Sequence, residues 1–325
     1  MNIAVDTKVE FKKFPSLENT YRQKEIDMVE NLGYSNEPYI VTEKVHGANF
    51  SFWLSEVDGE VNIRCAKRTS FIDEGEKFFN YKPVLEKYKT NLEELFHYMK
   101  DTRNVELVVI YGELFGGNIQ SGMCYNLEQD FIAFDLSYNG VTHNNKVVSY
   151  GILKNFEIPT IPVIGIYPTL SEALEVQESF TSLLCREDFD GKEEHKESEG
   201  VVIEPVTPHW YPSGSRVYFK KKTKRFLERG GKSNVTHKSL EELPVELKSI
   251  LTTAFEYITQ PRFEAVCSKI GEVTIKDIGK VIGLMTQDIL IDMQKDYIEI
   301  PDNKKFMKLL QQQVQTFIRP ILLSK

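Results

Sequence analysis

The chain of 325 residues is 41% hydrophobic and 27% charged, with a net charge of −8, which is typical of an ordinary globular protein. This acidic balance argues against a protein that coats nucleic acid through its overall charge, and the length favours two domains over one. No stretch reaches the ~18 apolar residues that a membrane span needs. The first residues also lack the pattern of a signal peptide, so we expect a cytoplasmic protein, or one in the host-cell cytoplasm if it is viral.

Four cysteines are spread along the chain, at Cys65, Cys124, Cys185 and Cys267. No two of them are close enough in sequence to suggest a CxxC redox site or a zinc cluster. Scattered thiols fit a reducing compartment, where a cysteine usually acts as a small buried hydrophobic side chain. We therefore expect no metal cluster built from cysteine.

Short runs of strand-forming residues alternate with turn signals and two helical patterns up to about residue 223. The strand-like runs lie at residues 61–68, 105–114, 130–136, 200–205 and 216–220, and the helical patterns lie at residues 82–100 and 169–184. Such a mixture is typical of an α+β fold. We therefore predict an N-terminal domain of mixed or antiparallel sheets plus helices, at residues 1–232.

The chain changes character near residues 228–238, which contain two glycines and no apolar run and so indicate a linker. A capping-box pattern follows at residues 239–242, and helices are expected at residues 274–297 and 302–323. The sequence therefore predicts an all-α C-terminal domain at residues 233–325.

The stretch "VTEKVHGANFSFW" interrupts good strand formers with a lysine, a histidine and a glycine. Because glycine weakens a strand, either the chain turns here or Lys44 is held where its amine can act. An unprotonated lysine amine can attack an electrophilic phosphorus. Such a site must lower the lysine pKa with nearby cations, a metal or desolvation, and must supply positive charge to the phosphates.

Three later motifs place an acidic or aromatic side chain at the end of a strand. Glu113 lies in "YGELFGG", Phe134 lies in "FIAFDL", and Glu199 opens "EGVVIEP". Taken alone, Phe134 could be a core residue and Glu199 a strand-end charge. Only the ordered set of motifs favours a functional role for each.

The basic run "RVYFKKKTKR" carries six basic side chains and no acid. In isolation such a run is typical of a solvated strand. Strand alternation places Val217 and Phe219 on one face and Tyr218, Lys220 and Lys222 on the other. Two ammonium groups are therefore expected on the face opposite the apolar one.

The ordered set KVHG, GELFGG, FIAFD, EGVVIEP and FKKK resembles the collinear motifs of covalent lysyl-nucleotidyltransferases, the ATP-dependent ligases and mRNA capping enzymes. Within that superfamily, "EKVHGANFSF", "AKRT", "GELFGGNIQ" and "FKKFPSLEN" look like the versions found in type-2 RNA ligases. These are the nick-sealing ligases of bacteriophages and the kinetoplastid editing ligases. The resemblance covers roughly residues 8–230.

The resemblance implies a role for each matched residue. Lys44 would be the nucleophile that takes AMP from ATP, Glu43 would lie against the adenine through its backbone, and Phe134 would stack on the base. Glu113 would hold the ribose, and Glu199 would serve the metal or the phosphate geometry. An aromatic face suits a flat purine, and a carboxylate can accept hydrogen bonds from ribose hydroxyls.

The resemblance also implies that Lys220 and Lys222 contact the α-phosphate, where lysines act as point charges. Further residues match positions that the family uses for ATP, phosphate or polynucleotide steps, namely His46, Asn49, Lys67, Arg68 and Gln120. One position departs from the pattern, because many relatives carry a basic residue where this sequence has Glu204. That departure implies the loss of one phosphate contact.

The family implies an ATP-dependent RNA ligase that seals 3′-OH and 5′-phosphate ends through a lysyl-AMP intermediate. Its substrate would be RNA, with nicks in duplex RNA preferred, and its cofactors would be ATP and Mg²⁺ or Mn²⁺. Magnesium binds phosphates with few carboxylates and several waters, so no dense acidic cluster is needed. A monomer is expected, and the helical domain would engage the nucleic acid.

Two other functions remain open. A capping guanylyltransferase uses the same lysine chemistry with GTP. Such enzymes typically carry K-x-D-G at the lysine motif and an OB-fold after the last motif, and this sequence has neither pattern. A DNA ligase is disfavoured on the same grounds. The chain after Lys222 has helical spacing rather than the short, evenly spaced strands of a barrel. A catalytically inactive RNA-binding relative is disfavoured by the intact lysines and carboxylates.

Overall fold

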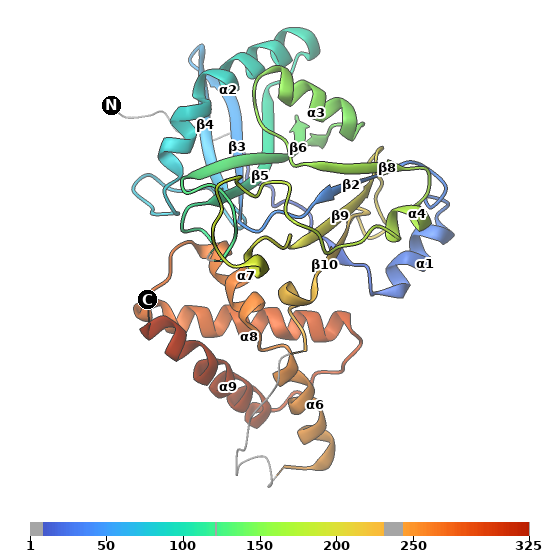
Figure 1. Cartoon of the computed structure of the whole chain (residues 1–325), viewed down its shortest axis with the longest axis vertical. Coiled ribbons are helices and arrows are strands. Elements are labelled where there is room, and N and C mark those ends of the chain that lie inside the picture. The colour runs from blue at the N-terminus through green and yellow to red at the C-terminus, as the bar shows by residue number, and fades with distance from the viewer. Residues whose placement is uncertain (1–8, 121, 231–242, 325) are drawn as a thin grey trace. The chain divides into compact units, whose positions relative to one another are not determined.

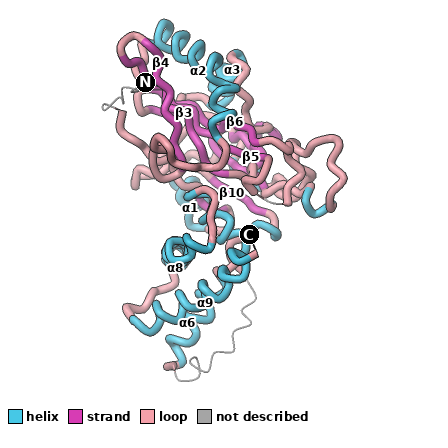
Figure 2. Tube along the Cα trace, turned by 90° about the vertical axis from the view of Figure 1, so that its left-hand side faces the viewer, coloured by secondary structure: helices cyan, strands magenta, loops and turns pink. Residues whose placement is uncertain are grey.

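The computed structural model describes residues 9–120, 122–230 and 243–324. By its internal contacts the chain divides into two compact units, Met1–Thr223 and Lys224–Lys325. In the described residues, all strands belong to the first unit, and the second unit contains only helices (Figures 1 and 2). The predicted boundary at residue 232 lies outside the described residues, as do most of the predicted linker and the capping-box pattern at residues 239–242.

Two five-stranded sheets make up the first unit. The first sheet has the order β1 (Glu18–Asn19), β10 (Phe219–Lys222), β9 (Gly200–Pro205), β2 (Tyr39–Glu43) and β8 (Val163–Tyr167). The second sheet has the order β4 (Glu60–Lys67), β3 (Ala48–Val57), β5 (Leu107–Gly116), β6 (Gln129–Tyr138) and β7 (Val141–Thr142). Every pairing is antiparallel except the short β1–β10 pair.

Helices cover the outer faces of the two sheets. The helices of this unit are α1 (Gln23–Asn31), α2 (Tyr81–Arg103), α3 (Lys146–Asn155) and α4 (Leu170–Leu174), with a 3₁₀ turn η1 at Glu193–His195. Helix α2 packs on β3, β5 and β6, α3 packs on β6, and α4 packs on β2, β8 and β9 (Figure 1). An α+β fold with antiparallel sheets, as predicted, is confirmed.

Side-chain alternation along β3 explains why the second sheet is buried on both faces. Phe50, Phe52 and Leu54 belong to the core beneath α2, whereas Trp53 belongs to a separate aromatic cluster. That cluster also contains Val202 and Tyr218 from the first sheet and its approach to β10. Because successive side chains in a strand point to opposite faces, β3 contributes to the outer core and to the interior between the sheets.

The second unit is a helical bundle around one apolar core. It contains η2 (Lys224–Phe226), α6 (Val245–Glu256), α7 (Gln260–Ile270), η3 (Ile275–Asp277), α8 (Ile278–Lys295) and α9 (Lys304–Leu323). Thr259 caps α7 by accepting from Arg262 N, and Asn303 caps α9, as expected for short polar side chains at helix starts. Among the described residues, no helix combines the length and the apolar character that crossing a bilayer requires.

Four helix predictions can be compared with the structure. The patterns at residues 82–100, 274–297 and 302–323 correspond to α2, to η3 with α8, and to α9. The prediction at residues 169–184 is wrong beyond Leu174, where α4 ends. There Ser179 and Ser182 hydrogen-bond to Glu197 and Glu43, and such side-chain bonds compete with helix formation.

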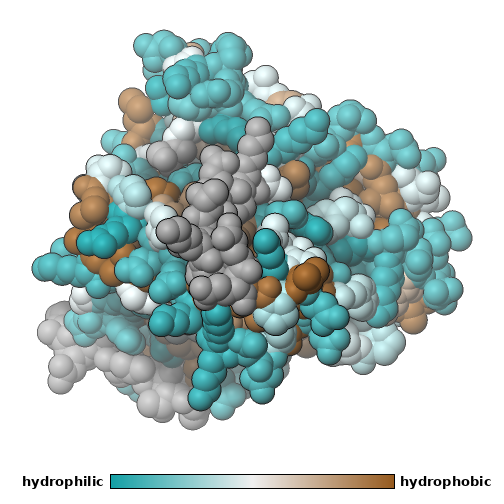
Figure 3. Space-filling model, turned by 90° about the horizontal axis from the view of Figure 1, so that it is seen from below, coloured by the Kyte–Doolittle hydropathy of each residue, from teal (hydrophilic) through white to brown (hydrophobic). Residues whose placement is uncertain are grey.

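Apolar side chains at the surface are dispersed. On the face in Figure 3, the hydrophobic side chains of the described residues lie in small groups among hydrophilic ones. Exposed examples are Leu127, Val245 and Tyr297, at 74%, 83% and 70%. Single exposed apolar residues are normal in proteins, so they mark no functional site by themselves.

Candidate active site

Strand register brings Lys44 to the end of the first sheet beside two other predicted residues. Strand β2 ends at Glu43, whose partner on β9 is Val201, and the Lys44 N–H donates to the carbonyl of Gly200 at 2.9 Å. On the other side of β9, Lys222 pairs with the same Gly200. Because Glu199 directly precedes Gly200, three motifs that are distant in sequence meet at one place.

Glu199 binds three basic side chains at this place. Its Oε2 lies 2.8 Å from Nζ of Lys44 and 3.3 Å from Nδ1 of His46, and its Oε1 lies 2.8 Å from Nζ of Lys222. Burial alone would raise the pKa of Glu199, but Lys222, Lys44 and His46 hold it well below its ordinary value. The carboxylate is therefore ionised and holds two lysines that would otherwise repel each other.

Gly47 explains the glycine that interrupts this strand-forming stretch. A β-carbon on Gly47 would lie 2.2 Å from the carbonyl oxygen of Leu114 and 2.7 Å from Cγ of Glu113. The carbonyl of Gly47 also accepts a hydrogen bond of 3.1 Å from Nε2 of Gln120, and His46 N donates to the hydroxyl of Tyr125 at 3.1 Å. The glycine therefore permits close backbone packing, and the packed loop positions Lys44.

A cavity of about 90 Å³ lies next to Lys44. The predicted site residues that line it are Glu43, Lys44, Asn49, Arg68, Glu113 and Phe134. The cavity thus combines a lysine, carboxylates and a guanidinium with an aromatic wall.

Six other lining residues were missed by sequence reasoning, namely Phe14, Leu17, Val45, Ile161, Val202 and Tyr218. Signals for three of them were present in the sequence. Phe14 and Leu17 lie in "FKKFPSLEN", and Tyr218 is on the strand face predicted for Lys220 and Lys222. The apolar Val45, Ile161 and Val202 carry no sequence signal that separates them from core residues.

The aromatic wall of the cavity is built from three rings. Phe14 lies 4.8 Å from Phe134 and 5.8 Å from Tyr218, measured between ring centres. Val217 and Phe219 belong to the core on the other side of the sheet, so the predicted alternation of this strand is confirmed. Flat aromatic faces are suited to stacking on a nucleobase.

Glu113 is the carboxylate with the most perturbed acidity among the cavity residues. Burial, opposed by the nearby charge of Lys44, raises the pKa of Glu113 to about 7. The residue pairs with Asn49 in the β3–β5 register, and the charge of Arg68 also acts on it. Glu113 can therefore change its protonation state near neutral pH.

Lys67 and Lys220 are absent from the cavity wall, and Glu43, although it lines the cavity, directs its carboxylate elsewhere. The side chain of Glu43 is turned to the loop that follows α4 and accepts hydrogen bonds from Ser182 Oγ and from Leu183 N at 2.8 Å. Lys67 forms an ion pair with Glu76. Lys220 is half-buried and lies two residues before Lys222, on the same face of β10. The backbone of Glu43 thus remains available to the cavity, as the resemblance implies.

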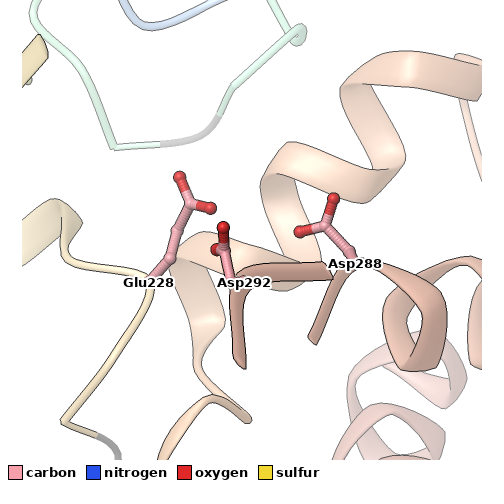
Figure 4. Close-up of side chains that lie close together, drawn as sticks. All are labelled: Glu228, Asp288 and Asp292. Carbon is pink, nitrogen blue, oxygen red and sulfur yellow. The ribbon is translucent and has the colours of Figure 1, made fainter. Parts of the chain in front are cut away.

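Three carboxylates gather in the helical unit, from Glu228, Asp288 and Asp292 (Figure 4). Nη1 of Arg262 lies 2.5 Å from Asp288 and its Nη2 lies 2.7 Å from Asp292, and Lys269 binds Asp288 at 2.6 Å. These basic side chains meet the negative charge, so the cluster is part of the packing of the helices. A larger depression of about 460 Å³ at the start of α9 brings together no comparable set of reactive groups.

Comparison with known proteins identifies the family. The profile of the RNA ligase family matches residues 37–222, and that of the T4 RNA ligase 2 C-terminal region matches residues 241–322. The mitochondrial RNA-editing ligase 2 of Trypanosoma brucei brucei is 36% identical over 110 residues, which is 33% of this chain and 26% of the relative. RNA-editing ligase 1 of the same organism is 33% identical over 95 residues, 28% of this chain and 20% of the relative.

Two solved structures of Naegleria gruberi RNA ligase mutants are also similar. One with ATP and manganese has a TM-score of 0.49 at 17% identity, covering 67% of this chain and 58% of that chain. One without ligand has a TM-score of 0.48 at 18% identity, covering 67% and 57%. The chain spans about a quarter or less of the length of the trypanosome relatives. Because the family profile matches more than half of the chain, the protein belongs to the RNA ligase family, in the type-2 branch that its motifs resemble.

Proposed function

We propose that this protein is an ATP-dependent RNA ligase. The observation that carries the proposal is the placement of Lys44 and Lys222 on opposite oxygens of one buried carboxylate, Glu199. This group adjoins a cavity with aromatic walls and the carboxylate of Glu113. A nucleophile, charge for phosphates and a surface for a base are thus in one site.

In the proposed reaction, Lys44 first gives up a proton to water, and its Nζ then bonds to the α-phosphorus of ATP. The bond from that phosphorus to pyrophosphate breaks, and the nitrogen loses a second proton. Lys222 stabilises the negative charge that develops on the transferred group. The 5′-phosphate of RNA then displaces the lysine to form a 5′–5′ pyrophosphate linkage. Finally the 3′-OH attacks that 5′-phosphate and releases AMP.

A divalent cation, Mg²⁺ or Mn²⁺, would be held by Glu199, whereas Glu113 would hold the ribose. When bound, such an ion neutralises phosphate charge and orients the transferred group. In this structure both oxygens of Glu199 face basic side chains. Lys44 loses its positive charge once its nitrogen is bonded to phosphorus, which leaves Oε2 with one cationic partner fewer. The donor set therefore fits an ion that requires few carboxylates.

The proposed substrate is RNA with a 3′-OH and a 5′-phosphate, preferably as a nick in a duplex. The match of the helical unit to the T4 RNA ligase 2 C-terminal region supports a role for this unit in holding the nick. The four free cysteines are compatible with the proposed cytoplasmic location. We further propose that the protein acts as a monomer.

A capping guanylyltransferase and an inactive relative are the alternative functions. In the described residues after Thr223 the chain forms only helices, which disfavours the OB-fold of a capping enzyme. The contacts among Lys44, Glu199 and Lys222 are intact, which disfavours an inactive relative. Neither alternative is supported by a further observation.

Covalent labelling with α-labelled ATP or GTP tests the proposal. We expect wild-type protein to be labelled by ATP in an acid-labile bond, and Lys44→Ala to be unlabelled. Lys44→Arg should also fail, because arginine stays protonated and cannot attack. Labelling by GTP alone would indicate a capping enzyme. Labelling of Lys44→Ala would show that Lys44 is not the nucleophile.

A further inference from the structure

Four charged side chains from distant parts of the sequence are buried together in the first unit. Asp135 lies on β6 of the second sheet and Glu204 on β9 of the first, whereas Lys146 opens α3 and Arg216 precedes β10. None of the four is more than 1% exposed. The cluster therefore connects the two sheets from within.

The four groups form a closed ring of alternating charge. Nζ of Lys146 lies 3.4 Å from Oδ1 of Asp135 and 2.9 Å from Oε1 of Glu204. Arg216 pairs its Nη1 with Oδ2 of Asp135, and its Nη2 lies 2.7 Å from Oε2 of Glu204. The Lys146 contacts lack hydrogen-bond geometry and act through charge. Each basic group thus binds both acids, and the charges cancel.

Asp135 is held in its charged form. Burial alone would raise the pKa of Asp135, but Arg216 and Lys146 hold it below its ordinary value. Buried ion pairs add little stability over apolar side chains of the same volume, but removing one partner leaves an unpaired buried charge. A balanced ring is therefore better suited to fixing the relative position of its elements than to increasing stability.

The ring is attached to the aromatic wall of the cavity on both sheets. The ring of Tyr218 lines the cavity, and its centre lies 5.0 Å from Cζ of Arg216 and 5.8 Å from Nζ of Lys146. Burial and the nearby charge of Glu204 raise the pKa of the Tyr218 hydroxyl. On the other sheet, Phe134 lines the cavity and directly precedes Asp135, and its carbonyl accepts a hydrogen bond of 3.2 Å from Tyr150 Oη. Each aromatic residue is thus connected to a different carboxylate of the ring.

We infer that Asp135, Lys146, Glu204 and Arg216 form a positioning ring that sets the separation between Phe134 and Tyr218, and thereby the fit of the cavity to a nucleobase. This inference rests on the proposed function, because it concerns the same cavity. The ring residues are absent from the cavity wall, so they act through the two aromatic residues and touch no nucleotide.

The ring also gives Glu204 a role. From sequence, an acid at this position implied the loss of a phosphate contact. In the structure its side chain is fully buried and binds both Lys146 and Arg216. The acid therefore belongs to a charge arrangement that a basic residue at the same position would disrupt, because three cations would then share one carboxylate.

Three variants test the connection, Tyr218→Phe, Glu204→Gln and the double variant. The measurement is single-turnover labelling of the full chain over a range of ATP concentrations. We expect Glu204→Gln to raise the ATP concentration for half-maximal labelling by roughly tenfold, the effect of weakening the charged hydrogen bond from Arg216. Tyr218→Phe removes a hydroxyl close to Glu204 and should raise this concentration in the same direction. The maximal rate should stay within about threefold, because the ring does not contact the phosphates. The double variant should resemble Glu204→Gln rather than multiply the two effects.

Two control variants remove similar groups outside the ring. Tyr39→Phe removes another buried hydroxyl of the same sheet, which donates to the carbonyl of Tyr34 at 2.9 Å. Glu178→Gln removes a carboxylate that pairs with Lys221 at 3.2 Å. Both controls should label with the wild-type ATP dependence, and thermal unfolding confirms that each variant is folded at the assay temperature.

The outcomes separate this inference from the proposed function. Wild-type protein that takes no label from ATP would contradict the proposed function. Normal ATP dependence in Tyr218→Phe and Glu204→Gln, or a lower maximal rate at unchanged half-saturation, would overturn the positioning ring alone. If Glu204→Gln fails to fold, Tyr218→Phe decides the question, since it removes only one hydroxyl.

Discussion

A β-carbon on Gly47 would overlap the carbonyl oxygen of Leu114 at 2.2 Å. The loop that carries Lys44 therefore packs on strand β5 at backbone contact. Lys44, the proposed nucleophile, is positioned by the lack of a side chain at Gly47 as well as by the groups that bind its amine.

Gly47→Ala is expected to displace this loop, because the obstructing atom belongs to backbone and cannot rotate away. Overpacking of this kind typically costs ~1–3 kcal/mol of unfolding free energy, and labelling by ATP should fall with it. The control is Gly151→Ala in helix α3, where a β-carbon meets nothing within 4 Å and should stabilise by about 0.5–1 kcal/mol. Chemical denaturation and ATP labelling measure both variants, and wild-type behaviour of Gly47→Ala would show that the loop can adjust.

Lys222→Ala is expected to slow the formation of lysyl-AMP. Removing one donor from a site that stabilises developing negative charge typically costs roughly 10²–10³ in rate, and Lys220→Ala should act in the same direction. Lys221→Ala is the matched control, because this neighbour points to the opposite face and donates to the carbonyls of Leu174 and Val176. Equal single-turnover rates for Lys222→Ala and Lys221→Ala would show that Lys222 does not stabilise the transferred phosphate.

Glu113 should make the stability of the protein dependent on pH. Its pKa is raised to about 7 in the folded protein, above the ordinary value of about 4.3. Its contribution to stability is therefore complete below about pH 4.3 and is lost as the pH rises through 7. Glu113→Gln should gain unfolding free energy relative to wild type between pH 5 and 8, by at most about 3 kcal/mol, and by less because the side chain borders an open cavity.

Urea denaturation of both proteins at pH 5 and pH 8 measures this difference. Glu86→Gln, which removes an exposed acid on α2, serves as the control and should show no comparable change with pH. A constant difference between Glu113→Gln and wild type at the two pH values would show that Glu113 does not titrate in this range.

A fragment ending at residue 232 should retain the first chemical step and lose much of the last. All the matched motifs lie before this position, so the fragment should still form lysyl-AMP. Sealing of pre-adenylylated nicked RNA should fall, because the helical unit is proposed to hold the nick. In the full-length protein sealing should weaken steeply with salt, since phosphate contacts release counterions. Equal sealing by fragment and whole chain would assign the helices another role.

Local sequence patterns predicted the long helices of this protein, missed α1 and α3, and extended α4 too far. Apolar spacing identified α2, α8 and α9, because these helices bury one face along their whole length. The same spacing was misleading after Leu174, where the hydrogen bonds of Ser182 to Glu43 and of Ser179 to Glu197 replace helical ones. Tertiary contacts of this kind leave no periodic signal in the sequence.

The part of the site that could be predicted consists of residues in motifs whose order along the chain is that of the family. Lys44, Glu199 and Lys222 were assigned together because the resemblance fixes their order, and the register of β2, β9 and β10 explains why they meet. Asp135 and Arg216 could not be paired from sequence, since a buried ion pair between distant residues has no local pattern. Their pairing depends on how the two sheets pack.

The apolar cores of the two units are separate in the described residues. The buried residues that form the cores of the first unit all lie at or before Phe219. The buried residues that form the core of the second unit all lie at or after Leu243. A chain with independent cores does not satisfy the two-state approximation, so calorimetry should resolve two melting transitions. A ligand bound to one unit raises only the transition of that unit. The melting profile would thus report, for any nucleotide, RNA or substitution, which half of the chain it acts on.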